Sequence, residues 1–137
     1  MKTLLNIGLV GVGRMGVAYA RYLAYRVPGA TLYAVSDVRA EAAESVRAEF
    51  GASKAYVNYR DLINDPAVDA IVVMTPTKYH KDVVIAAARA GKAIFCEKPL
   101  SLDLEEAKEM QAVVEQSGVF FQLGFMRRYD AGYAAAK

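Results

Sequence analysis

The sequence has 137 residues, the length of one domain, and 55% of them are hydrophobic, which is enough for a sizeable core. Its 17 basic and 15 acidic residues are spread along the chain and leave a net charge of +2, so there is no electrostatic basis for binding nucleic acid or a membrane surface. No apolar run approaches the length of a membrane span, and the single cysteine, Cys96, excludes an internal disulfide and suits a reducing cytoplasm.

From its start the chain alternates between strand-like and helix-like stretches. Short apolar runs predict strands at residues 4–10, 31–36, 54–57, 70–74, 93–96 and 119–123. Between them, amphipathic runs predict helices at residues 14–26, 39–50 and 59–64, then from a Thr77 cap to Ala90, and from a Ser101 or Asp103 cap to Gln116. The strand at 70–74 is continuously apolar, so we expect both of its faces to be covered. For the last of these helices, Leu100, Leu104, Ala107, Gln111 and Val114 fall on one face at helical spacing.

The first strand runs into the most informative motif of the chain, Gly11-x-Gly13-x-x-Gly16. Gly11 permits a tight turn, Gly13 leaves room for a pyrophosphate to approach the backbone, and Gly16 lets the next helix pack closely. That helix points its free N–H groups at the phosphates, so Arg14 and Met15 also belong to the predicted phosphate-binding turn. Such a motif alone is weak, but a strand precedes it and Asp37 ends the second strand about 20 residues further on, where a carboxylate accepts both ribose hydroxyls.

Together these features predict an α/β fold, a doubly wound parallel Rossmann sheet in three α/β/α layers. The dinucleotide fingerprint favours the strand order 3-2-1-4-5-6, with the ligand across the carboxyl ends of strands 1 and 4. The pattern shows no metal-ligand set. The expected cofactor is NAD or NADP, bound at the carboxyl edge of the sheet.

The choice between the two cofactors depends on Asp37 and Arg39. The Asp37 carboxylate repels a 2′-phosphate, which favours NAD over NADP. Arg39 follows two residues later and either pairs with that phosphate or is a solvated residue in the first turn of a helix. We expect NAD to be preferred.

Two further stretches follow strand ends at the same edge. Thr75-Pro76 comes after the fourth strand, where the nicotinamide side of a dinucleotide passes, although a plain turn with an N-cap is the alternative. His80, the only histidine, falls in the first turn of the next helix and is expected to face the crevice, whereas a lone histidine is more often a surface or packing residue. No partners for a conventional triad are visible.

Glu97-Lys98-Pro99 follows the fifth strand directly. A lysine held there can hydrogen-bond a substrate hydroxyl and stabilise developing alkoxide charge, while the alternative is a solvated Glu–Lys pair. Pro99 restricts the backbone of Lys98, and both cis and trans forms of the bond between them remain open. Cys96 is interpreted as a buried small hydrophobic residue.

In their order and spacing, Gly11-x-Gly13-x-x-Gly16, Asp37, Thr75-Pro76 with His80, and Glu97-Lys98-Pro99 resemble the Gfo/Idh/MocA family of sugar and inositol oxidoreductases. The segment 124–130 resembles the inositol 2-dehydrogenase branch. The resemblance implies a dinucleotide-binding domain at residues 1–124 and, at residues 125–137, the start of a crossover to a second, substrate-binding domain. It implies that Lys98 binds and polarises the reacting hydroxyl, and that His80, Glu97 and Arg127 lie with the glycine turn, Asp37, Arg39, Thr75 and Pro76 around the cofactor.

The same resemblance implies oxidation of a secondary hydroxyl of a cyclic polyol or sugar, with hydride passing to the nicotinamide. The family's general base lies in the second domain, which this sequence does not reach, so we expect this chain to bind NAD without turnover. The alternative is a stand-alone dinucleotide-binding sensor or partner module. The apolar strand at 119–123 and the tail through Tyr129 and Tyr133 predict a homo-oligomer, most simply a dimer.

Overall fold

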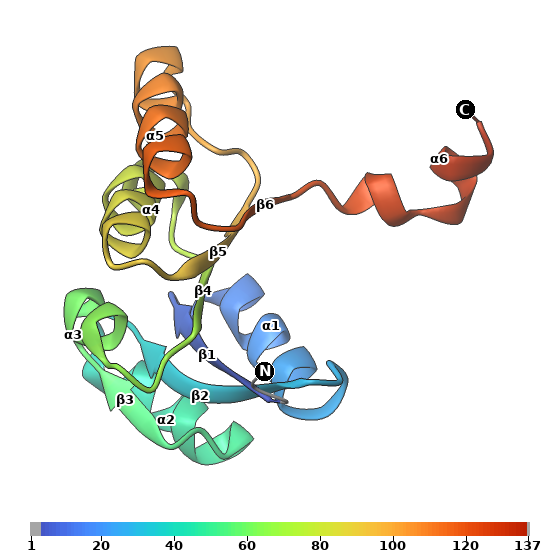
Figure 1. Cartoon of the computed structure of the whole chain (residues 1–137). Helices are drawn as coiled ribbons and strands as arrows, with labels where there is room; N and C mark the ends of the chain where they lie inside the picture. The colour runs from blue at the N-terminus through green and yellow to red at the C-terminus, as the bar shows by residue number, and fades with distance from the viewer. Residues whose placement is uncertain (1–3, 137) are drawn as a thin grey trace.

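The computed structural model of the chain describes residues 4–136, which form one sheet with helices on both faces (Figure 1). The strands are β1 (Leu5–Val10), β2 (Ala30–Ser36), β3 (Lys54–Tyr56), β4 (Ala70–Val73), β5 (Ala93–Glu97) and β6 (Phe121–Gly124). The helices are α1 (Arg14–Tyr25), α2 (Ala40–Phe50), α3 (Tyr59–Asn64), α4 (His80–Arg89), α5 (Leu104–Ser117) and α6 (Ala131–Ala135), with 3-10 helices η1 (Thr77–Tyr79) and η2 (Met126–Tyr129).

All neighbouring strands are parallel, and their order is β3-β2-β1-β4-β5-β6. This confirms the predicted doubly wound Rossmann sheet. The order reverses between β1 and β4, and their carboxyl ends lie side by side because Val10 pairs with Val73. The loops after these two strands therefore form the topological switch point at which such sheets bind ligands.

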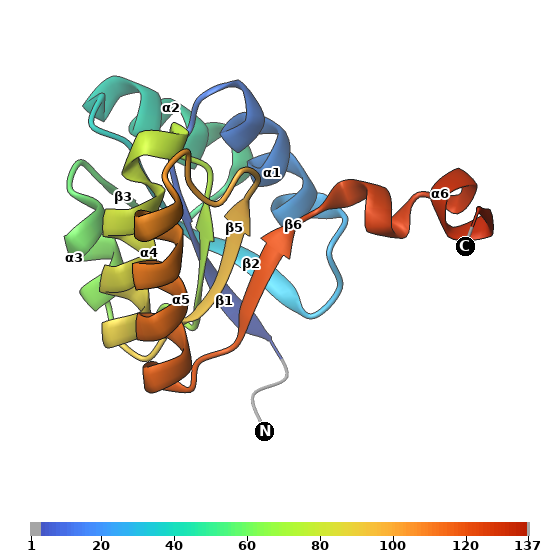
Figure 2. The ribbon, with the colours of Figure 1, turned by 90° about the horizontal axis from the view of Figure 1, so that it is seen from above.

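The helices form two layers, one on each face of the sheet (Figures 1 and 2). Helices α3, α4 and α5 pack on one face, in a core that includes Leu62, Val84 and Met110. Helices α1 and α2 pack on the other face, in a core that includes Leu23 and Phe50. This arrangement confirms the three-layer prediction.

The central strand and the lone cysteine are buried as expected. In β4, Ile71 and Val73 face one core and Val72 faces the other, so the strand is covered on both faces. Cys96 is buried in β5, and burial, aided by the nearby Glu97 charge, raises the pKa of its thiol to about 12. Cys96 is therefore a core residue rather than a reactive thiol.

Three local predictions are wrong. Thr77 does not cap a helix to Ala90: Pro76 leads into the tight 3-10 turn η1, and α4 begins only at His80, with no side-chain cap at either start. The last strand begins at Phe121 rather than residue 119, because the chain must cross from the left-handed Gly118 to the sheet edge. In α5, Leu104 is exposed, whereas Met110, Val113 and Val114 pack on the core, because this helix lies against α4 as well as the sheet.

The segment after β6 extends away from the sheet and its helices (Figures 1 and 2). It contains η2 and α6, whose start is capped by the Asp130 carboxylate. Its large apolar side chains are exposed: Phe125, Met126, Tyr129 and Tyr133. The segment therefore carries exposed apolar side chains, and it follows directly after β6, which is an edge strand of the sheet.

A buried carboxylate ties the end of α3 to β3. Asp65 accepts hydrogen bonds of 2.8 Å from both Lys54 Nζ and the Tyr56 hydroxyl, and one of 2.9 Å from the Ala67 backbone N–H. The Lys54 hydrogen bond is the largest influence on this carboxyl, and the net effect lowers the pKa of Asp65 to about 2. The ionised form is thus favoured by folding.

We expect the free energy of unfolding to fall as the pH is lowered from about 4 to about 2. The folded-state pKa of Asp65 lies below the unfolded value of about 3.9, so its contribution is present above pH 4 and is lost as the carboxylate is protonated in the folded chain. Urea denaturation at a series of pH values measures this loss. Asp65→Asn should lower the free energy of unfolding at pH 7 by about 1–3 kcal/mol and flatten the acid limb; an unchanged acid limb would show that other groups cause it.

Candidate functional site

Two of the three glycines after β1 are required by the structure, each for a different reason. Gly11 has a positive φ of +94°, and its N–H donates to the Ser36 carbonyl at 2.8 Å. A Cβ at Gly11 would lie 2.8 Å from the Met74 backbone, and a Cβ at Gly16 would overlap the Gly11 carbonyl. These two glycines therefore allow the turn and the close packing of α1.

Gly13 is the exception, because neither conformation nor packing requires it. Its φ of −69° and ψ of −168° are extended values that any residue adopts, and a Cβ built there meets no atom within 4 Å. Gly13 nevertheless begins α1, and its carbonyl accepts the first helical hydrogen bond, from the Val17 N–H. The open space above it lies at a helix N-terminus, which is where an anionic group is favoured.

Asp37 links the loop after β2 to the glycine turn. Its Oδ2 accepts a 3.0 Å hydrogen bond from the Val12 N–H, and its Oδ1 accepts bonds from the Arg39 N–H and from Arg39 Nε at 2.9 Å. Partial burial acts to raise the pKa of Asp37, but the hydrogen bonds from Arg39 and Val12 outweigh it and the net shift is downward. An ionised carboxylate thus stands beside the turn, already paired with Arg39.

A cavity of about 700 Å³ runs along the carboxyl edge between these loops. Most of the predicted cofactor residues line it: Gly11, Gly13, Arg14, Met15, Asp37, Arg39, Thr75 and Pro76. Val38, Tyr59 and Tyr79 are among its other lining residues. Sequence reasoning missed these three side chains, because nothing in their spacing marks a ligand contact.

A second cavity of about 250 Å³ adjoins the first, and Met15, Met74, Thr75 and Pro76 line both. Its other lining residues are Thr77, His80, Glu97, Lys98 and Met126. The structure thus brings the Glu97-Lys98 stretch and the Thr75-Pro76 stretch to one place, at the ends of the adjacent strands β5 and β4.

Glu97 and Tyr19 hold the backbone of Lys98. Glu97 Oε2 accepts a 2.8 Å hydrogen bond from the Lys98 N–H, and Glu97 Oε1 accepts one of 2.9 Å from the Tyr19 hydroxyl on α1. Burial, reinforced by the Glu97 hydrogen bond, raises the pKa of Tyr19, so its hydroxyl stays a donor. Sequence reasoning missed Tyr19, which has no chemical motif around it. The Lys98–Pro99 peptide bond is cis.

His80 lines the smaller cavity, but its ring is committed elsewhere. The residue is only 1% exposed; Nδ1 lies 2.9 Å from the Pro99 carbonyl oxygen and Nε2 lies 2.9 Å from that of Thr75. Both ring nitrogens therefore face backbone carbonyls, and contact of His80 with the cofactor stays a prediction.

Arg127 lies outside this arrangement. It belongs to η2, its guanidinium lies 5.1 Å from the centre of the Tyr133 ring, and it is not among the described residues that line the two cavities. Its contact with the cofactor stays a prediction.

Two observations show that the larger cavity suits a dinucleotide. The space above Gly13 is open at a helix N-terminus, so a phosphate can approach the backbone there. At the junction of the two cavities, the hydroxyl of Thr75 has no hydrogen-bond partner among residues 4–136. The residues present therefore fit a ligand with a phosphate centre and a polar end.

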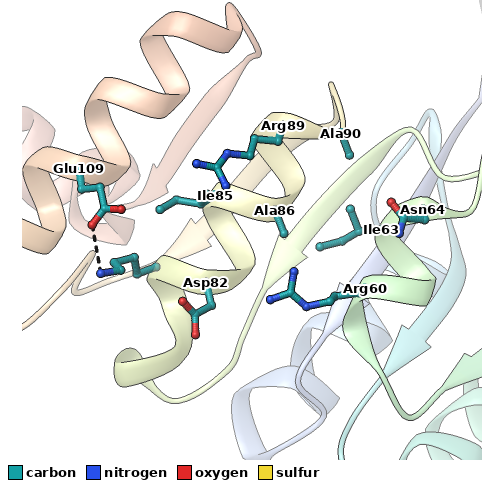
Figure 3. A pocket seen from close by; sticks show the side chains of 10 residues that line it. Arg60, Ile63, Asn64, Asp82, Ile85, Ala86, Arg89, Ala90 and Glu109 are labelled. Carbon is teal, nitrogen blue, oxygen red and sulfur yellow. Dashed lines mark ion pairs between the residues drawn. The ribbon is translucent and has the colours of Figure 1, made fainter.

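A separate hollow of about 450 Å³ lies over the helix layer of α3, α4 and α5 (Figure 3). Charged side chains of both signs line it, among them Arg60, Asp82 and Arg89, and Lys81 Nζ lies 3.0 Å from Glu109 Oε2. None of the predicted site residues lines this hollow. Its mixed charges give no preference for a ligand of one sign.

The side chains and helices of residues 4–136 also bear on metal binding and on membrane insertion. No group of three or more His, Cys, Asp and Glu side chains in that range is placed to hold a metal ion. No helix in the same range combines the length and the apolar character needed to cross a membrane.

Comparison with known proteins agrees with this geometry. The profile of a family described as "Oxidoreductase family, NAD-binding Rossmann fold" matches residues 5–125. The chain is 43% identical over 137 residues to scyllo-inositol 2-dehydrogenase (NAD(+)) of Bacillus subtilis, covering 100% of this chain and 40% of that protein. It is 40% identical to myo-inositol 2-dehydrogenase of Thermotoga maritima, covering 97% of this chain and 40% of that one.

A similar solved structure is scyllo-inositol dehydrogenase from Lactobacillus casei with bound NAD(H) and scyllo-inositol. It superposes with a TM-score of 0.93 at 34% identity, covering 97% of this chain and 39% of that one. The chain thus spans about 40% of the length of these relatives. With the glycine turn, Asp37 and the matched residues 5–125, the chain belongs to the Gfo/Idh/MocA oxidoreductase family and forms its NAD-binding Rossmann fold.

Proposed function

We propose that this chain binds NAD along the two joined cavities, as the cofactor-binding part of a dehydrogenase that oxidises a secondary hydroxyl of inositol or a related polyol. The observation that carries the proposal is the continuous lining from Gly13 and Asp37 through Thr75 to Lys98. The names of the relatives support the substrate class, since they are inositol dehydrogenases.

In this proposal the pyrophosphate lies over Gly13 at the start of α1, and the adenosine ribose lies against Asp37. Lys98 serves the other end, where its ammonium donates a hydrogen bond to the reacting hydroxyl and stabilises negative charge that develops on the oxygen. NAD, when bound, supplies the hydride acceptor.

By itself, we expect the chain to bind NAD without appreciable turnover. The only histidine is buried between carbonyls, and the Glu97 carboxylate is occupied by Tyr19 and the Lys98 N–H. The described residues around Lys98 thus offer no available general base, a group that typically contributes about 10²–10⁴-fold to the rate.

The cellular compartment is a separate point. The buried thiol of Cys96, which forms no disulfide, supports a reducing compartment, and we propose the cytoplasm.

Calorimetry with NAD tests the binding, and absorbance of reduced nicotinamide after addition of myo- or scyllo-inositol tests the turnover. We expect saturable binding and an absorbance that stays at background. Absence of NAD binding would refute the proposed function. Sustained production of NADH that is lost in Lys98→Ala would instead refute the absence of turnover and support the role of Lys98.

Asp37→Ser is expected to weaken NAD binding by about 10- to 100-fold, the value of hydrogen bonds to a charged group. The same change should strengthen NADP binding, because it removes the repulsion of the 2′-phosphate and releases Arg39 from its ion pair. Titration of both cofactors into both proteins measures the shift. Asp37→Asn is the matched control, since it keeps an acceptor for the Val12 N–H without the charge. If the unmodified chain binds NADP as well as NAD, Arg39 outweighs Asp37.

We also expect the chain to self-associate, most simply as a dimer. Phe125 is 56% exposed and Tyr129 is 72% exposed, and they follow β6, which is an edge strand of the sheet. Light scattering across micromolar to millimolar concentrations measures the mass. Phe125→Ser with Tyr129→Ser should shift the chain toward monomer, and a monomer at all concentrations in the unmodified chain would contradict the expectation.

A further inference from the structure

We propose that His80 is a positioning residue, which joins the loop after β4 to the loop after β5 and so sets where Lys98 stands relative to the cofactor. The β4 loop is defined as residues 74–76 and the β5 loop as residues 98–103. The inference rests on the proposed binding of NAD and assigns His80 a role other than contact with the ligand.

The ring of His80 bonds to both loops at once. Nε2 lies 2.9 Å from the Thr75 carbonyl oxygen in the β4 loop. Nδ1 lies 2.9 Å and 3.3 Å from the carbonyl oxygens of Pro99 and Leu100 in the β5 loop. His80 itself begins α4, so one buried side chain connects two loops and a helix.

The chemistry of the three partners explains why an imidazole stands here. Carbonyl oxygens only accept hydrogen bonds, so a side chain between them must offer donors in opposite directions. An imidazole has a nitrogen on each side of a rigid ring; both nitrogens donate when the ring carries two protons, and one of them donates in either neutral tautomer. A Gln amide donates from one end only, and its oxygen would then face a carbonyl oxygen.

The contacts of His80 affect Lys98 because the two residues that flank this lysine, Glu97 and Pro99, are both held by hydrogen-bonding groups. On one side, the Lys98 N–H donates to Glu97, which is held by the Tyr19 hydroxyl. On the other side, the carbonyl of Pro99 faces His80. The backbone of Lys98 is thus fixed from α1 and from α4, while its side chain lines the smaller cavity.

The β4 loop, which His80 contacts, lines both cavities. Thr75 and Pro76 line the larger and the smaller cavity, and His80 holds the carbonyl of Thr75. Asp37 and Gly13 line only the larger one. Loss of the His80 link should therefore disturb the smaller cavity and the end of the dinucleotide that reaches it, and should leave the adenosine end undisturbed.

A comparison of two ligands tests this. ADP-ribose shares the adenosine, pyrophosphate and ribose units of NAD but lacks the nicotinamide. In His80→Gln, calorimetry should show NAD binding weakened by about tenfold and ADP-ribose binding unchanged. The matched control is Asp37→Ser, which should weaken both ligands by the same factor.

The outcomes separate the two proposals. If the unmodified chain binds neither ligand, the proposed function fails. If it binds both but His80→Gln weakens them equally, or weakens neither, the positioning role fails while NAD binding stands. If His80 had only a structural role, His80→Gln would lower the unfolding temperature and would affect the binding of the two ligands equally.

The unmodified chain provides a second test that does not depend on the folding of a variant. Because His80 is the only histidine, its ring signals in ¹⁵N-edited NMR need no assignment. A ring N–H held against a buried carbonyl should exchange slowly with solvent, and the ring nitrogen shifts should change on addition of NAD but not of ADP-ribose. Exchange as fast as that of free histidine, or equal changes with both ligands, would overturn the proposal.

Discussion

Gly13→Val is expected to reduce NAD binding by at least about 100-fold, equivalent to about 2.7 kcal/mol, while the chain stays folded. The backbone of Gly13 already has φ and ψ values open to valine, and its added carbons would enter space that no atom of the chain occupies. That space is where the pyrophosphate must approach the start of α1. The only cost to folding is that of a poor N-cap residue, about 1 kcal/mol.

Calorimetry with NAD and urea denaturation of the same protein measure the two effects separately. Gly13→Ala adds a single methyl group and should give an intermediate affinity, with the same N-cap cost of about 1 kcal/mol. Binding by Gly13→Val that equals that of the unmodified chain would show that the phosphates lie elsewhere.

Gly16→Ala is expected to have the opposite signature, a loss of stability of about 1–3 kcal/mol that is visible without any ligand. The added Cβ would overlap the carbonyl of Gly11, so α1 must move away from the turn. Alanine's better helix propensity, worth up to about 1 kcal/mol, offsets only part of this cost.

The urea midpoint in the absence of NAD measures this loss, and Gly13→Ala serves as the matched control because it lies in the same motif with open space around its Cβ. Equal stability of Gly16→Ala and the unmodified chain would mean that α1 relaxes at no cost, and that the third glycine of the motif is not there for packing.

The sheet order and the residues of the glycine turn could be predicted because both follow from short-range signals. Strand-like runs alternate with helical ones, and the glycine spacing with Asp37 selects one strand order among those that the alternation allows. The buried face of α5 could not be predicted in the same way. The position of α5 against α4 decides which side of it is buried, and helical spacing alone placed Leu104 with Val114.

The residues of the candidate site also fall into two groups, those that short-range signals predict and those whose role depends on tertiary contacts. Gly13, Asp37, Thr75 and Lys98 sit directly at strand ends, and parallel strands carry such residues to one edge. The roles of His80 and Tyr19 depend instead on which backbone carbonyl or carboxylate lies opposite after folding. Such partners are distant in sequence and of no particular residue type, so no sequence motif predicts them.

The two ends of the proposed site are built from hydrogen bonds that share no residue. Val12, Asp37 and Arg39 form one set, and Thr75, His80 and Pro99 form the other. Free-energy changes at sites without common partners are usually additive. Preference between the two dinucleotides can therefore be altered at the end of β2 while the backbone around Lys98 at the end of β5 stays as it is, so that the two ends of the site can change independently.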